Sequence, residues 1–204
     1  MRAVTVVSGR AVPLDRRDVD TDQIIPAAWL KRVERTGFGP GLFAAWRNDP
    51  GFVLNAPGAD EAKILVAGAN FGCGSSREHA VWALQDFGFE AVVAPGFADI
   101  FRNNSVGAGL LTAHAEESVV AELFAILARD PGAEIVLDVA ARTVAVPSTG
   151  LRAPFALPDY ARWRLLEGLD DIGVTLRHEE EIARFEANRL SWLPSVTPPA
   201  HAAV

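Results

Sequence analysis

A short glycine-rich segment carries the side chains in this sequence that are best suited to chemistry. Residues 72–77 read Gly-Cys-Gly-Ser-Ser-Arg, and they lie between an apolar run at 64–66 and a stretch at 80–84 that is typical of the start of a helix. Glycine lets the backbone approach a ligand closely, and the free N–H groups at a helix N-terminus attract anions. Arg77 adds a planar guanidinium that suits a carboxylate or a phosphate. We therefore expect a small anion to bind at this turn.

The same turn also has a purely structural interpretation. Ser75 and Glu78 have the spacing of a capping box, in which the serine caps a helical N–H and the glutamate reaches back to the serine backbone. The two glycines before Ser75 favour the ligand interpretation, because an ordinary cap does not need so open a backbone. Both interpretations can hold together, with one of Ser75 and Ser76 capping the helix and the other facing the ligand.

Cysteine and histidine usage limits the metal chemistry of the chain. The single cysteine, Cys73, excludes an internal disulfide and cannot alone hold an iron–sulfur cluster, which needs several thiolates. The four histidines have no ligand-like spacing. Asp18, Asp20 and Asp22 are spaced like the start of a calcium loop, but glutamine and tryptophan stand where that loop needs glycine and glutamate. We therefore expect that this chain itself binds no metal or cofactor.

Length and composition favour an ordinary globular protein. The chain has 204 residues, half of them hydrophobic, and a formal net charge of −7. No basic stripe indicates nucleic-acid binding. No apolar stretch approaches the roughly 20 residues that span a bilayer, and the first residues lack the long apolar region of a secretion signal. We expect a cytoplasmic protein that binds neither nucleic acid nor membrane.

Short apolar strands alternate with helices, which predicts an α/β architecture. Strands are expected at 2–14, 63–67, 91–94, 110–113, 134–138 and 143–146. Helices are expected from the glycine-rich turn to about residue 87 and at 27–33, 42–46, 97–104, 116–129, 158–168 and 179–189. The strands after residue 130 look like a hairpin, so we expect a mixed sheet. We expect one domain over residues 1–194 and a disordered tail at 195–204.

Five segments of the chain resemble the small subunits of bacterial 3-isopropylmalate dehydratase, a family in which the swivelling domain of aconitase-type hydro-lyases is a separate polypeptide. The segments occur in family order and lie at 20–26, 35–39, 70–79, 96–101 and 168–176. The resemblance implies a three-layer β/β/α swivelling domain with a mixed sheet. It also implies a large-subunit partner that holds a [4Fe-4S] cluster through three cysteines. The implied reaction is dehydration of 2-isopropylmalate to isopropylmaleate and rehydration to 3-isopropylmalate, in leucine biosynthesis.

The resemblance further implies roles for individual residues. Ser75 matches the serine whose alkoxide removes a proton from the carbon beside a substrate carboxylate. A free serine is a very weak base, so it needs support from backbone N–H groups, a helix N-terminus and a cation. Ser76 and Arg77 match positions that bind the substrate carboxylate. Thr21 and Asp22 form a Thr-Asp motif that belongs to the same site.

The choice of substrate is expected to depend on the region around residues 29–33. Apolar side chains at positions 25, 29 and 33 would suit an isopropyl group, whereas basic side chains at 31, 32 and 35 would favour a second carboxylate. Lys31 is the candidate for a substrate contact. The alternative is that Lys31 and its neighbour at position 32 form a solvated helix face. His79 is interpreted as structural support for the turn, and Cys73 as a small neighbour within it.

The sequence also departs from the family pattern. Residues 106–108 are smaller than in many relatives, and residues 112–114 read Thr-Ala-His in place of a more usual Leu-Pro-apolar ending. These departures keep open a related hydro-lyase that acts on a methylmalate, citraconate or homoaconitate type of acid. Another class remains open as well, a non-catalytic module that binds carboxylate or phosphate without a partner.

Overall fold

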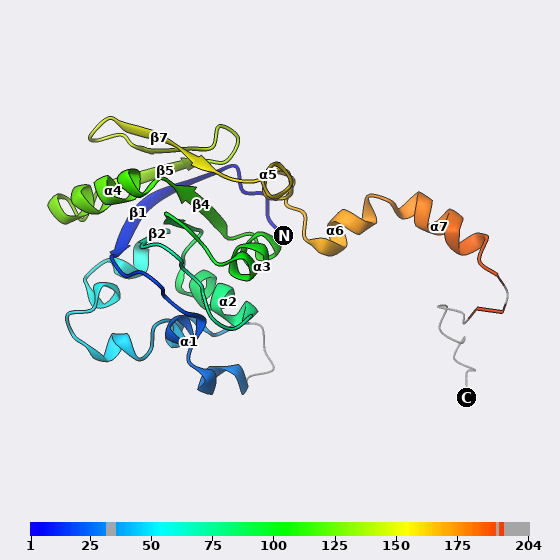
Figure 1. The fold of residues 1–204 in the computed structure, drawn as a ribbon, viewed down its shortest axis with the longest axis horizontal. Helices are drawn as coiled ribbons and strands as arrows, with labels where there is room; N and C mark the ends of the chain where they lie inside the picture. Colours follow the sequence, from blue (N-terminus) through cyan, green and yellow to red (C-terminus); the bar gives the residue numbers. More distant parts are fainter. Residues whose placement is uncertain (32–35, 191, 194–204) are drawn as a thin grey trace. The chain divides into compact units, whose positions relative to one another are not determined.

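The computed structural model of the chain describes residues 1–31, 36–190 and 192–193. It divides into two compact units, residues 1–170 and residues 171–204. In the first unit, strands close into a barrel in the order β1-β2-β3-β4-β7-β6-β5 (Figure 1). Their bounds are β1 Val6–Leu14, β2 Ile64–Ala67, β3 Ala91–Ala94, β4 Leu111–Ala115, β5 Glu134–Asp138, β6 Thr143–Val146 and β7 Leu151–Ala156.

The barrel consists of a parallel and an antiparallel part. Strands β1 to β4 are parallel, with Val12 opposite Leu65 between β1 and β2 and Leu65 opposite Val92 between β2 and β3. Strands β5, β6 and β7 pair antiparallel, and β1 and β4 join the two parts by antiparallel pairing with β5 and β7. The predicted α/β class and mixed sheet are confirmed. The sequence analysis missed β7.

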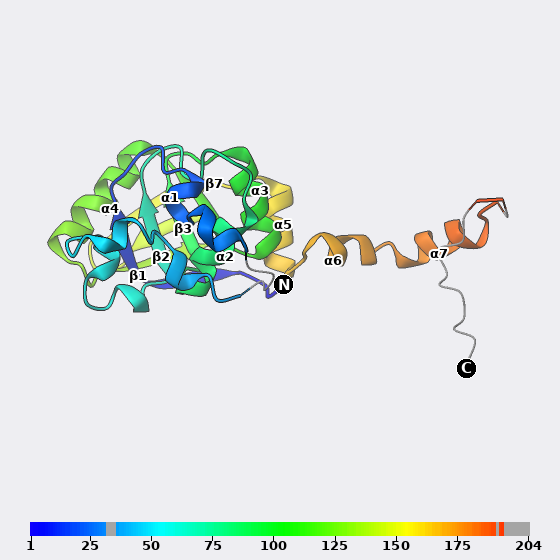
Figure 2. The same ribbon diagram turned by 90° about the horizontal axis from the view of Figure 1, so that it is seen from below.

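Helices and short 3-10 turns pack against the barrel, and α1, α2 and α3 lie on the side away from β7 (Figures 1 and 2). The α-helices of this unit are α1 Thr21–Ile24, α2 Glu78–Phe87, α3 Asp99–Ala108, α4 Glu117–Arg129 and α5 Asp159–Glu167. The 3-10 turns are η1 Ala27–Lys31, η2 Gly39–Gly41, η3 Trp46–Asn48, η4 Val53–Asn55 and η5 Ala59–Glu61. The helix expected at 42–46 is wrong, because residues 42–45 form turns and residue 46 is the first residue of η3.

Two hydrophobic clusters cover the opposite faces of the parallel strands. One side of β2, with Ile64 and Val66, packs into a cluster that includes the antiparallel strands and α4. The other side, with Leu65 and Ala67, packs into a cluster that includes α2 and α3. Since both faces are covered, every residue of β2 and β3 is buried. This explains why these strands are continuous apolar runs in the sequence.

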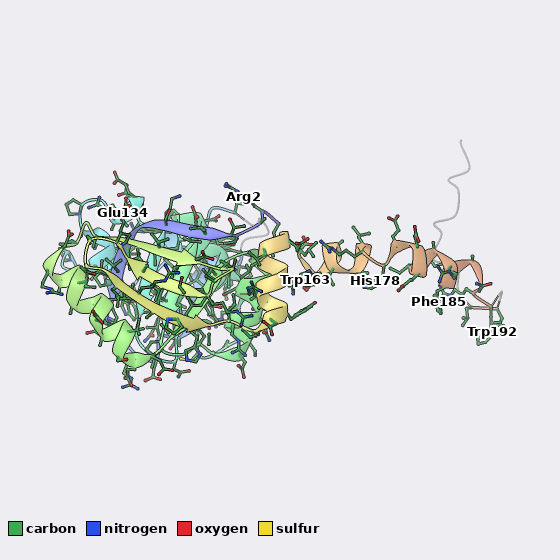
Figure 3. The ribbon with its side chains drawn as sticks, turned by 90° about the horizontal axis from the view of Figure 1, so that it is seen from above. Arg2, Glu134, Trp163, His178, Phe185 and Trp192 are labelled. Carbon is green, nitrogen blue, oxygen red and sulfur yellow. The ribbon has the colours of Figure 1, made fainter. Side chains whose placement is uncertain are left out.

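The described residues of the second unit, 171–190 and 192–193, contain two helices, α6 Asp171–Leu176 and α7 Glu179–Ala187. Several of its large apolar side chains are exposed, and Phe185 and Trp192, both labelled in Figure 3, are 71% and 75% exposed. The sequence analysis predicted α7 but not α6.

A single domain over 1–194 stays a prediction, and the expected tail at 195–204 lies outside the described residues. None of the helices in the described part of the chain combines the length and apolar character that a membrane crossing requires.

Candidate functional site

The glycine-rich turn connects β2 to α2, as the sequence predicts. Gly72 and Gly74 both have positive φ, +76° and +88°. A Cβ on Gly72 would lie 2.3 Å from Cγ of Phe101, a buried side chain of α3. Glycine is therefore required at position 72 both by its backbone conformation and by the close approach of α3.

A second segment, residues 18–22, lies alongside this turn. The Gly72 N–H donates to the Val19 carbonyl at 2.8 Å, and the Thr21 N–H donates to the Cys73 carbonyl at 2.9 Å. The Thr21 hydroxyl donates to the Ser75 carbonyl at 2.9 Å. The structure thus brings the Thr-Asp motif and the serine turn together, although more than 50 residues separate them in the sequence.

An ion pair joins the charged ends of these two segments. The guanidinium of Arg77 contacts the Asp22 carboxylate. The Arg77 side chain is only 17% exposed, whereas that of Asp22 is 54% exposed. Arg77 is therefore held in place, and its partner faces solvent. Ser75 and Ser76 are both exposed beside this pair.

The capping interpretation of the serines is wrong. Helix α2 begins at Glu78, and the residue at its N-cap is Arg77, which makes no side-chain cap. Ser75 therefore stands too early in the chain to cap the helix. A capping box does form at α1, where the Asp20 carboxylate accepts from the Gln23 N–H at 2.7 Å and the Gln23 side chain accepts from the Asp20 N–H at 2.9 Å.

The described candidates for substrate specificity, at residues 25–31, are not gathered at the serine turn in the way that the Thr-Asp motif is. Lys31 ends η1 and is exposed, and residues 32–35, which hold three further specificity candidates, lie outside the described residues. Ile25 is fully buried, and a Cβ on Gly41 would lie 2.5 Å from Ile25 Cδ1. Ile25 therefore cannot face an isopropyl group at an open surface. Trp29, half-buried, packs against the same glycine.

His79 lies among aromatic rings. Its ring centre is 5.2 Å from that of Phe38 and 4.7 Å from that of Trp82. The Phe38 N–H donates to the Asp86 carboxylate at 2.8 Å, so α2 also holds the chain that enters η2. These contacts support the interpretation of His79 as a structural residue.

Cys73 is half-buried within the turn. Burial raises the pKa of the Cys73 thiol, and the carboxylates of Asp20 and Asp18 add to the rise. A thiol with a raised pKa stays protonated at neutral pH, and the thiol form is a poor nucleophile. The environment of Cys73 therefore agrees with its interpretation as a neighbour in the turn.

The sequence analysis missed Asn70 as part of this site. Asn70 has a positive φ of +59°, and its side-chain amide donates to the Asp18 carboxylate at 2.8 Å. Asparagine is one of the few residues that tolerates this conformation. Its position just before Phe-Gly-Cys-Gly was the available signal. Among the described residues, no group of three or more His, Cys, Asp or Glu side chains is arranged to hold a metal ion.

Comparison with known proteins agrees with this architecture. The family model of the aconitase C-terminal domain matches residues 1–118, and that of the C-terminal domain of the 3-isopropylmalate dehydratase small subunit matches residues 171–195. A 3-isopropylmalate dehydratase small subunit of Frankia alni is 62% identical over 195 residues, which cover 96% of this chain and 99% of the relative. The chain belongs to the 3-isopropylmalate dehydratase small-subunit family. A member from a Nocardioides species is 57% identical over 197 residues, which cover 96% of this chain and 98% of that one.

A solved structure shows the same fold in this family. The crystal structure of 3-isopropylmalate dehydratase from Methanocaldococcus jannaschii is 25% identical to this chain, with a TM-score of 0.67. The match covers 88% of this chain and 98% of the other. The resemblance of the five sequence segments to this family, and the aconitase-type α/β domain that it implied, are confirmed.

Proposed function

We propose that this chain is the small subunit of a 3-isopropylmalate dehydratase, the hydro-lyase that isomerises 2-isopropylmalate to 3-isopropylmalate through isopropylmaleate in leucine biosynthesis. Family membership over nearly the whole chain supports the activity. The observation on which the site rests is the exposed pair of serines beside Arg77, with neither serine used to cap α2.

Ser75 is the proposed catalytic base. Its backbone carbonyl is fixed by the Thr21 hydroxyl, and its own side chain is exposed. As an alkoxide it would gain support from the positive charge of Arg77 and from the N–H groups at the start of α2, a ten-residue helix whose N-cap residue makes no side-chain cap. These groups stabilise the deprotonated form of Ser75 that proton removal needs.

Arg77 and Ser76 are the proposed binding groups for a substrate carboxylate. The guanidinium fork binds a carboxylate through two parallel hydrogen bonds, which fixes orientation as well as charge. Asp22 holds the guanidinium in position from the solvent side. Thr21 positions Ser75, and Lys31 is a proposed contact to a second polar group of the substrate.

The proposed active site is divided between two chains. A [4Fe-4S] cluster needs several thiolates, and this chain has one cysteine, so we place the cluster on the large-subunit partner. An iron of that cluster with an open coordination position would supply a Lewis acid for the substrate hydroxyl. The residues of this chain contribute the base and the carboxylate-binding groups on the facing surface.

Anaerobic turnover of 2-isopropylmalate tests this function. The chain is assayed alone and mixed with the iron–sulfur large subunit of the same organism, with citraconate and homoaconitate as competing substrates. We expect activity with 2-isopropylmalate in the mixture only. Activity of the chain alone would contradict the divided site. If the mixture assembles with an intact cluster but turns over only another acid, 2-isopropylmalate is not the substrate.

A further inference from the structure

Three loops meet at the carboxyl ends of the parallel strands, and the loop that carries Ser75 is the middle one. Residues 15–20 follow β1, residues 68–77 follow β2 and residues 95–98 follow β3. These loops lead into α1, α2 and α3, which lie together on one side of the barrel in Figure 1. The middle loop therefore has a neighbour on each side, and its contacts with these neighbours fix its path.

Backbone hydrogen bonds hold the start of the middle loop on both sides. The Asp18 N–H donates to the Ala69 carbonyl at 2.9 Å, which joins the middle loop to the loop after β1. On the other side, the Phe71 N–H donates to the Gly96 carbonyl at 3.0 Å, in the loop after β3. Asn70 lies between these two contacts, at the point where the chain leaves β2 and enters the glycine-rich turn.

Asn70 and Asp18 share an unusual backbone conformation and are bonded to each other. The φ angle is +59° for Asn70 and +53° for Asp18, both in the left-handed region. The side-chain amide of Asn70 donates to the Asp18 carboxylate at 2.8 Å. Glycine adopts such a φ without strain, so the backbone alone does not call for an asparagine at position 70. What the asparagine side chain adds is the bond to Asp18.

This side-chain bond lies at the entry of the turn, whereas the bond between Thr21 and Ser75 lies at its exit. Between the two bonds stand Gly72 and Gly74, and glycine permits many backbone conformations. A turn of this kind keeps one shape only where contacts at both ends hold it. Loss of the entry bond would let the start of the turn move away from the loop after β1 and would displace Ser75 with it.

We propose that Asn70 is a positioning residue for Ser75, which acts through Asp18 and fixes the path of the glycine-rich turn. The inference rests on the proposed dehydratase function, since its effect on turnover is an effect on the placement of the base. Asn70 contacts Asp18 and acts on Ser75 through the backbone between them. Its bond has a donor on one side and an acceptor on the other, so one substitution can break it and a second can remake it in the reverse direction.

Exchange of the two side chains tests this role in the enzyme assembled with its large subunit. Asn70→Asp keeps the shape of the side chain but places a carboxylate against that of Asp18. We expect kcat to fall by about tenfold or more and KM to change by less than about threefold, because a small misplacement of a catalytic group can cost up to about 10²-fold in rate.

Asp18→Asn keeps an oxygen that accepts from Asn70, so its kcat should stay within about threefold of that of the unchanged enzyme. In the double variant Asp18→Asn/Asn70→Asp, the amide at position 18 donates to the carboxylate at position 70. The double variant should therefore restore kcat to about the level of Asp18→Asn, since the two side chains form one interaction.

Two further variants separate positioning from folding and from charge. Asn70→Gly suits the left-handed backbone and therefore folds, but it lacks the amide, so kcat should still fall by about threefold or more. Asn48→Asp, at an exposed residue of η3, adds the same negative charge elsewhere and is the matched control. It should keep the kcat of the unchanged enzyme.

Hydrogen exchange of the full chain tests the same role without turnover. The Gly72 N–H donates to the Val19 carbonyl at 2.8 Å, so its exchange reports the contact between the turn and the loop after β1. Its exchange rate should rise by about tenfold in Asn70→Asp and return in the double variant. The N–H of Val93, in the buried strand β3, should exchange as in the unchanged chain, which would show that the opening is local.

An unchanged kcat in Asn70→Asp, or a double variant as slow as Asn70→Asp, would overturn the proposal. Equal exchange rates of the Gly72 N–H in the unchanged chain and in Asn70→Asp would overturn it as well. If the unchanged enzyme does not turn over 2-isopropylmalate, the proposed function fails, and the exchange rates still decide whether Asn70 holds the turn.

Discussion

The Thr21 hydroxyl donates a hydrogen bond to the Ser75 carbonyl across 2.9 Å, which ties the start of α1 to the turn before α2. Thr21 is buried, and its N–H also donates to the Cys73 carbonyl. The proposed base is thus positioned by a residue that is 54 positions away in the sequence. Thr21 acts through Ser75 in this arrangement, and a direct contact between Thr21 and substrate stays a prediction.

Thr21→Val should therefore lower kcat more than it raises KM. The substitution keeps the shape of the side chain but leaves the Ser75 carbonyl without its donor, which costs about 1 kcal/mol of stability. Turnover of the reconstituted enzyme and urea unfolding of the chain measure the two effects. Thr21→Ser keeps the hydroxyl and should restore kcat. Equal kcat values for the valine and serine variants would exclude this positioning role.

Arg77→Lys should raise KM for 2-isopropylmalate by about tenfold or more, because an ammonium cannot form the two parallel bonds of a guanidinium. It also weakens the contact with Asp22, so the remaining charge is less well placed. Michaelis kinetics of the assembled enzyme measure this change. A KM equal to that of the unchanged enzyme would remove Arg77 from substrate binding.

Gly72→Ala should destabilise the chain more than Gly150→Ala does. Both glycines have φ of +76°, so both substitutions introduce the same kind of backbone strain, about 1 kcal/mol. At position 72 the new Cβ would also overlap the Phe101 ring at 2.3 Å, whereas nothing lies within 4 Å at position 150. Overpacking of this kind adds about 1–3 kcal/mol. Equal losses of unfolding free energy would show that α3 can move away from the turn at no cost.

Cys73 should react slowly with iodoacetamide at pH 8. Its pKa is raised above that of an ordinary cysteine by burial and by Asp20 and Asp18, so at any pH below this raised pKa the thiolate fraction is smaller than in a free thiol. The alkylation rate should increase as pH rises past the ordinary thiol range. A small reference thiol, measured alongside, provides the comparison. Faster alkylation of Cys73 than of the reference at pH 8 would contradict the raised pKa.

The sequence predicted the buried strands more reliably than the exposed ones. Strands β2 and β3 are continuous apolar runs, because both of their faces are covered. Strand β7 has one buried residue, Phe155, and contains Pro154, so it lacks the pattern of a strand and gains its structure from pairing with β4 and β6. Closure of the barrel depends on this pairing and could not be read from local sequence.

The site, like the fold, was predictable where it depends on local sequence and not where it depends on contacts between distant segments. The sequence of the glycine-rich turn itself predicts the turn, because glycines stand between a strand and a helix. The structure shows that these glycines have positive φ. The long-range contacts of the turn have no such local signal, because the pairing of Arg77 with Asp22 depends on how the barrel brings two distant segments together. The alternative interpretation, in which Ser75 and Glu78 form a capping box, is wrong because α2 starts at Glu78 itself.

Turnover by the assembled enzyme that carries Ser75→Ala tests the central claim most directly. Since a positioned general base contributes about 10²–10⁴ in rate, we expect turnover of 2-isopropylmalate to fall by at least about 100-fold, while the large subunit still binds. Ser148→Ala, in the exposed turn between β6 and β7, is the matched control and should keep full activity. Substantial activity of Ser75→Ala in a mixture that assembles with an intact cluster would contradict Ser75 as the base.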